Sequence, residues 1–399
     1  MARSQWAVCC RFRLRNIATE RKGRPMARKH TPYYHKFIEL NAEIVDRLGF
    51  DAALRFTTVE EEHRATRETA GVYDVYCQGP IDIKGPGATA LLQKVLVNDL
   101  ERISDGGVLY SSVCNEQGGM LDDLTAYRFS AEHYWLVATP SRVAVIERWV
   151  TEHARDMRAY VTNCVSGTAY LSIQGPASRA TLATLTDADL STAALPYFRM
   201  TQATVAEVPA VISRTGYSGE LGYELYYPRD YSEHMWDAVL AAGKEHGVVP
   251  AGLGALRTVR IEKKYPLYGL DLSEGNTPVE AGLGWTVRRE KRGYIGEQVI
   301  ARQRNEGVDR LLVGLEFADL NFLPAPGDVI AVDGAEVGRI TSADRGWWLG
   351  KSLGLGYVAA SAAKAGVQVT VTSATSGESY PATVHTRAFY DPEMTRARA

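Results

Sequence analysis

The chain has 399 residues, with 45 Lys and Arg against 47 Asp and Glu, and a formal net charge of −2. Its length allows two or three domains with a substantial core, and its hydrophobic content of 45% is ordinary for a soluble globular protein. The balanced charge gives no nucleic-acid footprint, and no run reaches the ~18–20 consecutive apolar residues that a membrane span needs.

The first 29 residues differ from the rest of the chain. They carry many Arg and Lys, and Glu20 is their single acidic residue. They lack the apolar core of a secretory signal, although such a basic segment can mimic a transit peptide. The simpler interpretation is that translation starts at Met26. In either case we predict that residues 1–29 are a disordered or mis-annotated extension.

The next part of the sequence predicts helices alternating with strands. Thr31 and Pro32 suit the N-cap and the first position of a helix that reaches Phe50. Periodicity and turn signals then predict further helices over Val59–Ala70, Gly87–Val97, Ser141–Ala154, Tyr231–His246 and Leu253–Glu262, and strands over Val72–Ile83, Val108–Cys114, Leu121–Phe129, Tyr134–Ala138, Ala169–Ile173 and Gly282–Val287. The turn Asn115–Gly119 joins two of these strands into a hairpin.

The sequence pattern changes near Asp309, after which short β segments alternate with Gly and Pro turns. These segments are Val313–Phe317, Val329–Val332, Val337–Ser342, Leu355–Val358, Val367–Val371 and Ala382–Thr386. They predict a small antiparallel barrel or sandwich. The fold class is therefore α+β, with a mixed region over residues 30–308, an all-β domain over 309–392 and a tail over 393–399.

Cysteine and histidine patterns argue against metal and disulfide chemistry. The five cysteines are scattered and form no Cys-x-x-Cys pair, and the eight histidines form no His-x-x-x-His pair. We therefore predict no metal site, no disulfide framework and a cytoplasmic location.

The most informative segment is Arg214–Tyr227. Glycines recur there at every third position, with tyrosines and glutamates between and after them: Gly216, Gly219 and Gly222, then Tyr217, Glu220, Tyr223 and Glu224. Glycine lets the backbone turn tightly or approach a ligand, tyrosine offers a flat face, and a carboxylate can hold an amidine-like edge through two hydrogen bonds. The segment therefore suits a flat, nitrogen-rich heterocycle. On the segment alone, however, a plain glycine-rich hairpin is favoured.

Several polar residues beside turns have two possible roles. Asp99 either caps the next element or acts as a partly buried carboxylate that orients an amine. Asn115 either stabilises its turn or contacts a ligand amide, and one of Asp122 and Asp123 is expected to stabilise the turn before them. Trp347 and Trp348 either line an inter-domain cleft or pack the end of the barrel.

Together these segments resemble, in order, the motifs of the glycine-cleavage T protein (aminomethyltransferase) superfamily, whose members use tetrahydrofolate. The resemblance covers about residues 31–390. The main motifs that carry it are Glu61-Glu62-His63-Arg64, Leu96-Val97-Asn98-Asp99, Tyr110-Ser111, Asn115-Glu116-Gln117-Gly118-Gly119, Leu121-Asp122-Asp123-Leu124, Gln174-Gly175-Pro176, Arg214-Thr215-Gly216-Tyr217-Ser218-Gly219-Glu220, Leu267-Tyr268-Gly269 and Thr277-Pro278-Val279-Glu280.

The resemblance implies a fold and a cofactor. The fold would be three-lobed, with two interleaved α+β lobes and a C-terminal antiparallel β-barrel around a central channel for tetrahydrofolate. Asp99 would match the family's key acid near the reactive folate nitrogen. Glu224 and Tyr217 would grip the pterin, and Tyr110 and Asn115 would line the same channel.

Departures from the family's pattern bear on the substrate. The departing stretches are Tyr76-Cys77-Gln78, Leu256-Arg257 and Gly346-Trp347-Trp348, and the stretch Ala255–Lys263 resembles the folate lobes of sarcosine and dimethylglycine dehydrogenases and the tetrahydrofolate-dependent demethylases. The main prediction is therefore a one-carbon transferase that moves a methyl or methylene group from a small N-, O- or S-methylated donor to tetrahydrofolate. The predicted substrate contacts are Tyr76, Gln78, Arg257, Trp347 and Trp348.

Two alternatives stay open. One is a glycine-cleavage aminomethyltransferase that acts on a lipoyl carrier protein and releases ammonia. The other is a non-catalytic folate-binding module, whose relatives carry a Lys-Gly-Cys-Tyr signature; here Arg292-Gly293-Tyr294 stands in its place. In none of these interpretations is a nucleic acid or a membrane a partner.

Overall fold

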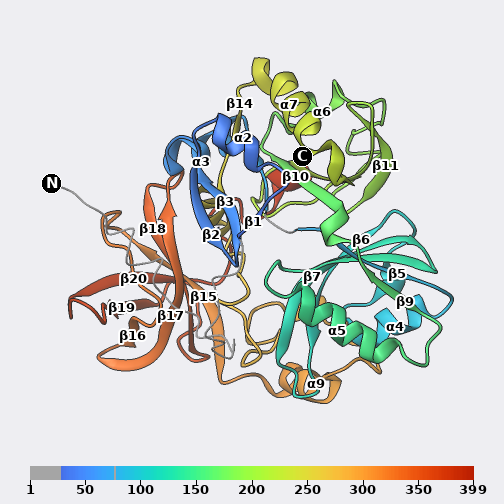
Figure 1. Cartoon of the computed structure of the whole chain (residues 1–399). Coiled ribbons are helices and arrows are strands. Elements are labelled where there is room, and N and C mark those ends of the chain that lie inside the picture. The colour runs from blue at the N-terminus through green and yellow to red at the C-terminus, as the bar shows by residue number, and fades with distance from the viewer. Residues whose placement is uncertain (1–27, 76–77) are drawn as a thin grey trace, which may run out of the picture.

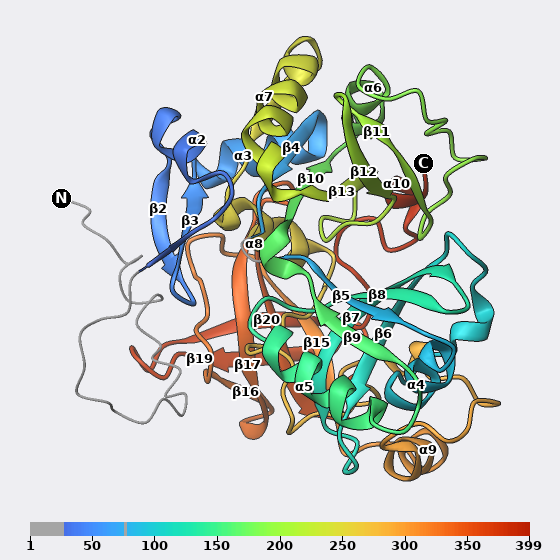
Figure 2. The same ribbon diagram turned by 45° about the vertical axis from the view of Figure 1, so that its right-hand side comes forward.

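The computed structural model describes residues 28–75 and 78–399. Most of the predicted N-terminal extension, including Met26, lies outside these residues, as does Tyr76. The described chain forms three lobes that surround a common centre (Figures 1 and 2).

The first lobe is built on a six-stranded sheet. Its order is β11 (Met200–Val205), β12 (Val208–Ser213), β13 (Gly222–Pro228), β10 (Thr168–Gln174), β4 (Ala70–Tyr73) and β14 (Val248–Pro250). Only the β14–β4 pair is parallel. The lobe also contains α2 (Tyr34–Glu39), α3 (Val59–Glu68), α6 (Ser178–Ala183), α7 (Ser232–Gly243), α8 (Leu253–Glu262) and a small sheet of β1 (Lys29–His30), β3 (Phe50–Arg55) and β2 (Glu43–Arg47).

The second lobe is inserted between β4 and β10 of the first. Its antiparallel sheet has the order β6 (Val108–Cys114), β7 (Met120–Ser130), β8 (His133–Val137), β5 (Pro80–Lys84) and β9 (Tyr160–Asn163). Its helices are α4 (Ala88–Val95) and α5 (Val143–Ala154), whose buried faces pack on one core with Ile81 and Leu136. Helix α9 (Glu297–Glu306) returns to this lobe later in the chain (Figure 1). The two lobes are thus interleaved in sequence.

The third lobe is a closed six-stranded antiparallel barrel. Its order is β15 (Arg310–Phe317), β18 (Lys351–Ala359), β17 (Ala335–Gly346), β16 (Val329–Val332), β19 (Gln368–Thr372) and β20 (Ser379–His385). All six predicted β segments of this region overlap these strands. The α+β class and the C-terminal antiparallel barrel are therefore confirmed. The chain then ends in α10 (Thr395–Arg398), which lies against the first lobe (Figure 2).

Two predicted elements are wrong and one is interrupted. The helix from Thr31 to Phe50 is limited to α2, because Asn41 takes a left-handed φ of 54° and the chain continues as the β2–β3 hairpin. The strand predicted over Gly282–Val287 is a 3₁₀ turn, η5 (Gly284–Thr286). The strand predicted over Val72–Ile83 is split into β4 and β5.

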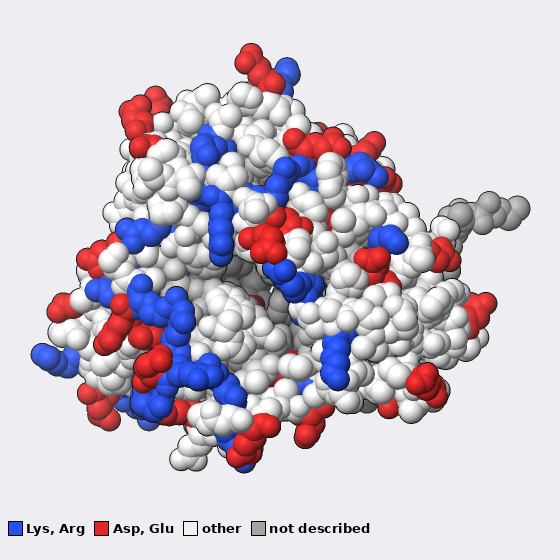
Figure 3. Space-filling view, turned by 180° about the vertical axis from the view of Figure 1, so that it is seen from behind, with Lys and Arg blue, Asp and Glu red and all other residues white. Residues whose placement is uncertain are grey.

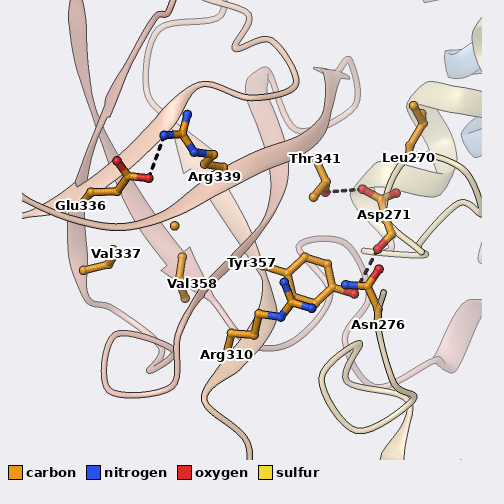
Figure 4. A pocket seen from close by; sticks show the side chains of 11 residues that line it. Leu270, Asp271, Asn276, Arg310, Glu336, Val337, Arg339, Thr341, Tyr357 and Val358 are labelled. Carbon is orange, nitrogen blue, oxygen red and sulfur yellow. Dashed lines mark hydrogen bonds and ion pairs between the residues drawn. The ribbon is translucent and has the colours of Figure 1, made fainter. Parts of the chain in front are cut away.

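The barrel is anchored to the first lobe through Asp271, a buried carboxylate. Asp271 Oδ2 accepts from Arg260 Nη1 at 2.8 Å, and Oδ1 accepts from Thr341 Oγ1 at 2.5 Å and from Ser342 Oγ at 2.7 Å. A pocket of about 400 Å³ opens beside it, next to Tyr357 (Figure 4). Arg310 and Arg339 on its wall pair with Glu280 and Glu336 at 2.9 Å each. Since these guanidinium groups already have partners, we assign the pocket no ligand.

Helix α8 ends in a hydrogen-bond pattern that normally requires glycine. Lys264 N donates to Ile261 O at 2.8 Å and Tyr265 N donates to Arg260 O at 3.0 Å, while Lys264 has a φ of 56°. We expect Lys264→Gly to raise the free energy of unfolding by about 1 kcal/mol, because the Cβ that disfavours this conformation is removed. Urea denaturation would measure the change. Lys264→Ala keeps the Cβ and is the matched control; an equal gain from both variants would contradict the backbone explanation.

Candidate active site

A tyrosine–aspartate pair lies on the β6–β7 hairpin of the second lobe. Tyr110 faces Thr125 across the hairpin, so Asp123 is its diagonal neighbour, and the Tyr110 hydroxyl donates to Asp123 Oδ2 at 2.8 Å. The exposed ring of Trp285 stacks on Tyr110, with 5.9 Å between ring centroids. Burial raises the pKa of Asp123 to about 6; the Tyr110 hydrogen bond opposes this rise and the charge of Asp271 adds to it. Asp123 can therefore exchange a proton near neutral pH.

The neighbouring Asp122 points to the opposite face of β7 and has a structural role. Thr139 N donates to its Oδ2 at 2.9 Å. Burial, followed by the charge of Asp123, raises its pKa well above the ordinary range of an aspartate. Strand alternation thus gives two adjacent carboxyl groups different surroundings, and only Asp123 lies beside Tyr110.

The glycines of the segment Arg214–Tyr227 pack against the protein itself. A Cβ on Gly216 or Gly222 would lie 2.0 or 2.3 Å from the Gln174 side-chain oxygen, and a Cβ on Gly219 would lie 2.3 Å from Lys263 Cγ. Gly219 also has a φ of 78°, which glycine accepts at little cost. The regular glycine spacing is explained by these close approaches.

Tyr217 is fixed by the loop that follows α8. Its hydroxyl donates to Pro266 O at 2.6 Å, and its ring stacks on Tyr265 at a centroid separation of 5.7 Å. Burial raises the pKa of Tyr217; the charge of Arg260 opposes this rise, and the charges of Asp123 and Asp271 add to it. Burial likewise raises the pKa of Tyr110, with smaller contributions from Asp123 and Tyr217.

Glu224, on β13, is surrounded by hydroxyl groups. Its Oε1 accepts from Tyr170 at 2.8 Å, and its Oε2 accepts from Thr215 at 2.5 Å and from Tyr127 at 3.3 Å. Tyr127 belongs to β7 of the second lobe, so this carboxylate also bridges two lobes. Glu224 as a residue is half-buried, and these hydroxyls fix the orientation of its carboxylate. Figure 3 shows that the rear of the molecule is hollowed where the lobes meet.

Asp99 and Asn115, two other predicted site residues, serve local structure. Asp99 Oδ1 accepts from Glu101 N at 3.0 Å, which caps a short 3₁₀ helix, and from Gln93 Nε2 at 2.7 Å. Burial of Asp99 favours its neutral form, but these hydrogen bonds and nearby Lys291 outweigh it and lower the pKa. Asn115 Oδ1 accepts from Gly119 N at 2.9 Å within its turn. Their roles toward folate stay predictions.

The predicted substrate contacts lie mostly where α8 meets the end of β17. Arg257 Nη2 is 3.2 Å from Asp344 Oδ2, Trp348 N donates to Glu262 Oε1 at 3.1 Å, and Trp347 lies under a guanidinium, with Arg345 Cζ 5.5 Å from its ring centroid. Gln78 is half-buried and its backbone N donates to Val75 O at 2.9 Å. Within the described residues, these contacts include none with the tyrosines and carboxylates described above. Contact of the predicted residues with substrate stays a prediction.

Two further observations concern the described part of the chain. No group of three or more His, Cys, Asp or Glu side chains there could hold a metal ion. No helix in the same part is long and apolar enough to cross a membrane.

Comparisons with known proteins place the chain in a family. The GCVT N-terminal domain model matches residues 33–291, and the glycine cleavage T-protein C-terminal barrel domain model matches residues 310–391. A protein of Moorella thermoacetica named aminomethyltransferase is 40% identical over 86% of this chain and 93% of its own length. Another of the same name, from Caldanaerobacter subterraneus subsp. tengcongensis, is 38% identical over 86% of this chain and 91% of its own.

A solved structure agrees with these relatives. The crystal structure of glycine cleavage system aminomethyltransferase T from Bartonella henselae superimposes with a TM-score of 0.83 at 26% identity, and the match covers 91% of this chain and 98% of that one. The main prediction, transfer from a small methylated donor, is therefore wrong, since relatives across most of the chain carry the name aminomethyltransferase. The chain is a one-carbon transferase of this kind, and it belongs to the glycine-cleavage T-protein family.

Proposed function

We propose that the protein is an aminomethyltransferase that transfers a one-carbon unit from an aminomethylated lipoyl carrier protein to tetrahydrofolate. The observation that carries this proposal is the identity of 35–40% with aminomethyltransferases over 86% of the chain. Members of the family use tetrahydrofolate as the acceptor, and the site offers the chemistry that this cofactor requires.

The residues around Glu224 fit a pterin. An amino-pyrimidinone edge presents two parallel N–H donors. A fixed carboxylate can accept a hydrogen bond from each of them, as it does from the two N–H groups of a guanidinium. Hydroxyls from Tyr170 and Thr215 hold the carboxylate of Glu224 without neutralising it. Tyr217 supplies an aromatic ring nearby in sequence, itself fixed by Pro266 and Tyr265. Glu224 and Tyr217 would hold the pterin ring.

Asp123 is the carboxyl group best suited to accept the proton of the folate amine. Bound tetrahydrofolate would supply the nucleophilic nitrogen that takes the carbon unit. Asp123 Oδ2 accepts from the Tyr110 hydroxyl at 2.8 Å, and burial raises the pKa of Asp123 to about 6. We therefore propose Asp123 as the carboxylate that orients this amine and accepts its proton, the role that the resemblance predicts for Asp99.

The proposal is tested with aminomethylated lipoyl carrier protein and tetrahydrofolate. We expect the purified protein to release ammonia and to form methylenetetrahydrofolate in equal amounts. Carrier protein without its lipoyl group is the control and should give neither product. Absence of both products with the loaded carrier would overturn the proposal.

A further inference from the structure

Glu220, in the glycine-rich segment, is a buried carboxylate whose function the proposed mechanism leaves unexplained. Only 3% of the residue is exposed. Its Oε1 accepts from Tyr390 Oη at 2.7 Å and from Arg67 Nη1 at 3.1 Å, and its Oε2 accepts from Arg396 Nε at 3.0 Å. Two of these three partners come from the segment that follows the barrel. A carboxylate buried at this cost needs such partners, so its position depends on them.

The segment that follows the barrel wraps over Glu220 from outside. Tyr390 N donates to Glu262 O at 2.9 Å, and its ring lies 4.2 Å from the Arg67 guanidinium carbon. Arg396 Nη2 donates to Arg67 O at 2.8 Å. Asp391 accepts from Lys263 Nζ through its backbone oxygen at 2.7 Å. The C-terminal segment is therefore fastened to α3 and α8 around the same carboxylate.

The segment that carries Glu220 also carries the two proposed pterin contacts, Tyr217 and Glu224. Arg67 Nη1 also donates to Ser218 O at 2.9 Å, so one guanidinium holds the loop at two points. Tyr217 precedes Glu220 by three residues and Glu224 follows it by four, as β13 begins. A shift of the loop at Glu220 would move both.

We propose that Glu220 is a positioning residue through which the C-terminal segment, by Tyr390 and Arg396, sets the loop in its folate-binding conformation. The inference rests on the proposed function, because it assumes that tetrahydrofolate binds at Tyr217 and Glu224. It assigns to the segment after the barrel a role in cofactor affinity and leaves the proton transfer to Asp123.

The test uses Tyr390→Phe and Arg396→Ala, which leave the buried Arg67–Glu220 pair in place and so avoid an unpaired buried charge. We expect the Kd for tetrahydrofolate, measured by titration calorimetry, to rise about threefold in Tyr390→Phe and about tenfold in Arg396→Ala. With saturating tetrahydrofolate, kcat should stay within about twofold of the unmodified protein, because the loss is one of binding. Arg396→Lys should recover part of the affinity.

The control is Glu393→Gln on the same segment. Glu393 is exposed and pairs with Arg387 at 2.7 Å, away from Glu220. The Kd of this variant for tetrahydrofolate should therefore equal that of the unmodified protein. A lower Tm with unchanged Kd in both test variants would overturn the inference and leave a merely structural role. If the unmodified protein binds no tetrahydrofolate, the proposed function fails and the inference falls with it; if it binds and the variants bind equally well, only the inference falls.

Discussion

Asp123→Asn is expected to lower kcat by about 10²–10³-fold, while Asp99→Asn lowers it by less than about fivefold. The amide that replaces the carboxylate would still accept from Tyr110 but could not take a proton from an amine. Asp99 already caps a 3₁₀ helix and accepts from Gln93, so its loss would loosen local structure only. Steady-state ammonia release with saturating carrier and tetrahydrofolate measures both effects.

The pH dependence of kcat gives a second test of the assignment of Asp123 as the proton acceptor. Burial raises the pKa of Asp123 to about 6, so its carboxylate form is lost as the pH falls through that value. Below about pH 6, kcat should fall tenfold per pH unit, and Asp123→Asn should abolish this limb. The reverse pattern, a large loss in Asp99→Asn and a retained limb in Asp123→Asn, would return the role to Asp99.

Only the elements that local sequence signals determine could be predicted. Barrel strands could be predicted because each alternates and is bounded by turn residues. The segment after Glu39 could not, since Asn41 and Leu48 adopt left-handed backbone that ordinary propensity does not foresee. Asn41 ends a helix that apolar spacing alone would extend, and the residues after it pair as β2 and β3.

The candidate site shows the same limit. The segment of Tyr217 and Glu224 could be singled out by its composition, but the prediction that these two residues hold a pterin came from the family resemblance. Asp123 could not be separated from Asp122 by composition, since only the register of β7 decides which carboxyl faces Tyr110. The hydroxyls of Tyr127 and Tyr170 were missed because they reach Glu224 from strands 97 and 54 residues away in sequence.

Glu224→Gln should weaken tetrahydrofolate binding by about 50-fold and leave the fold intact. Glutamine preserves the size of the side chain, but it replaces a charged acceptor pair by one neutral acceptor and an N–H₂ that would face the donors of the pterin edge; hydrogen bonds to charged groups contribute about 1.5–3 kcal/mol. Titration calorimetry measures the Kd. An unchanged Kd would remove Glu224 from the site.

Graded variants separate holding of the pterin from proton transfer. Tyr170→Phe removes one of the hydroxyls that orient Glu224, at 2.8 Å, and should raise the Kd only about threefold to tenfold. Asp123→Asn should leave the Kd within about threefold, since it acts on the chemical step. Tetrahydrofolate affinity and turnover would thus be lost in different variants, as expected if β13 holds the pterin ring and β7 supplies the carboxylate. If every variant lost both tetrahydrofolate affinity and turnover, pterin binding and proton transfer could not be assigned to separate strands.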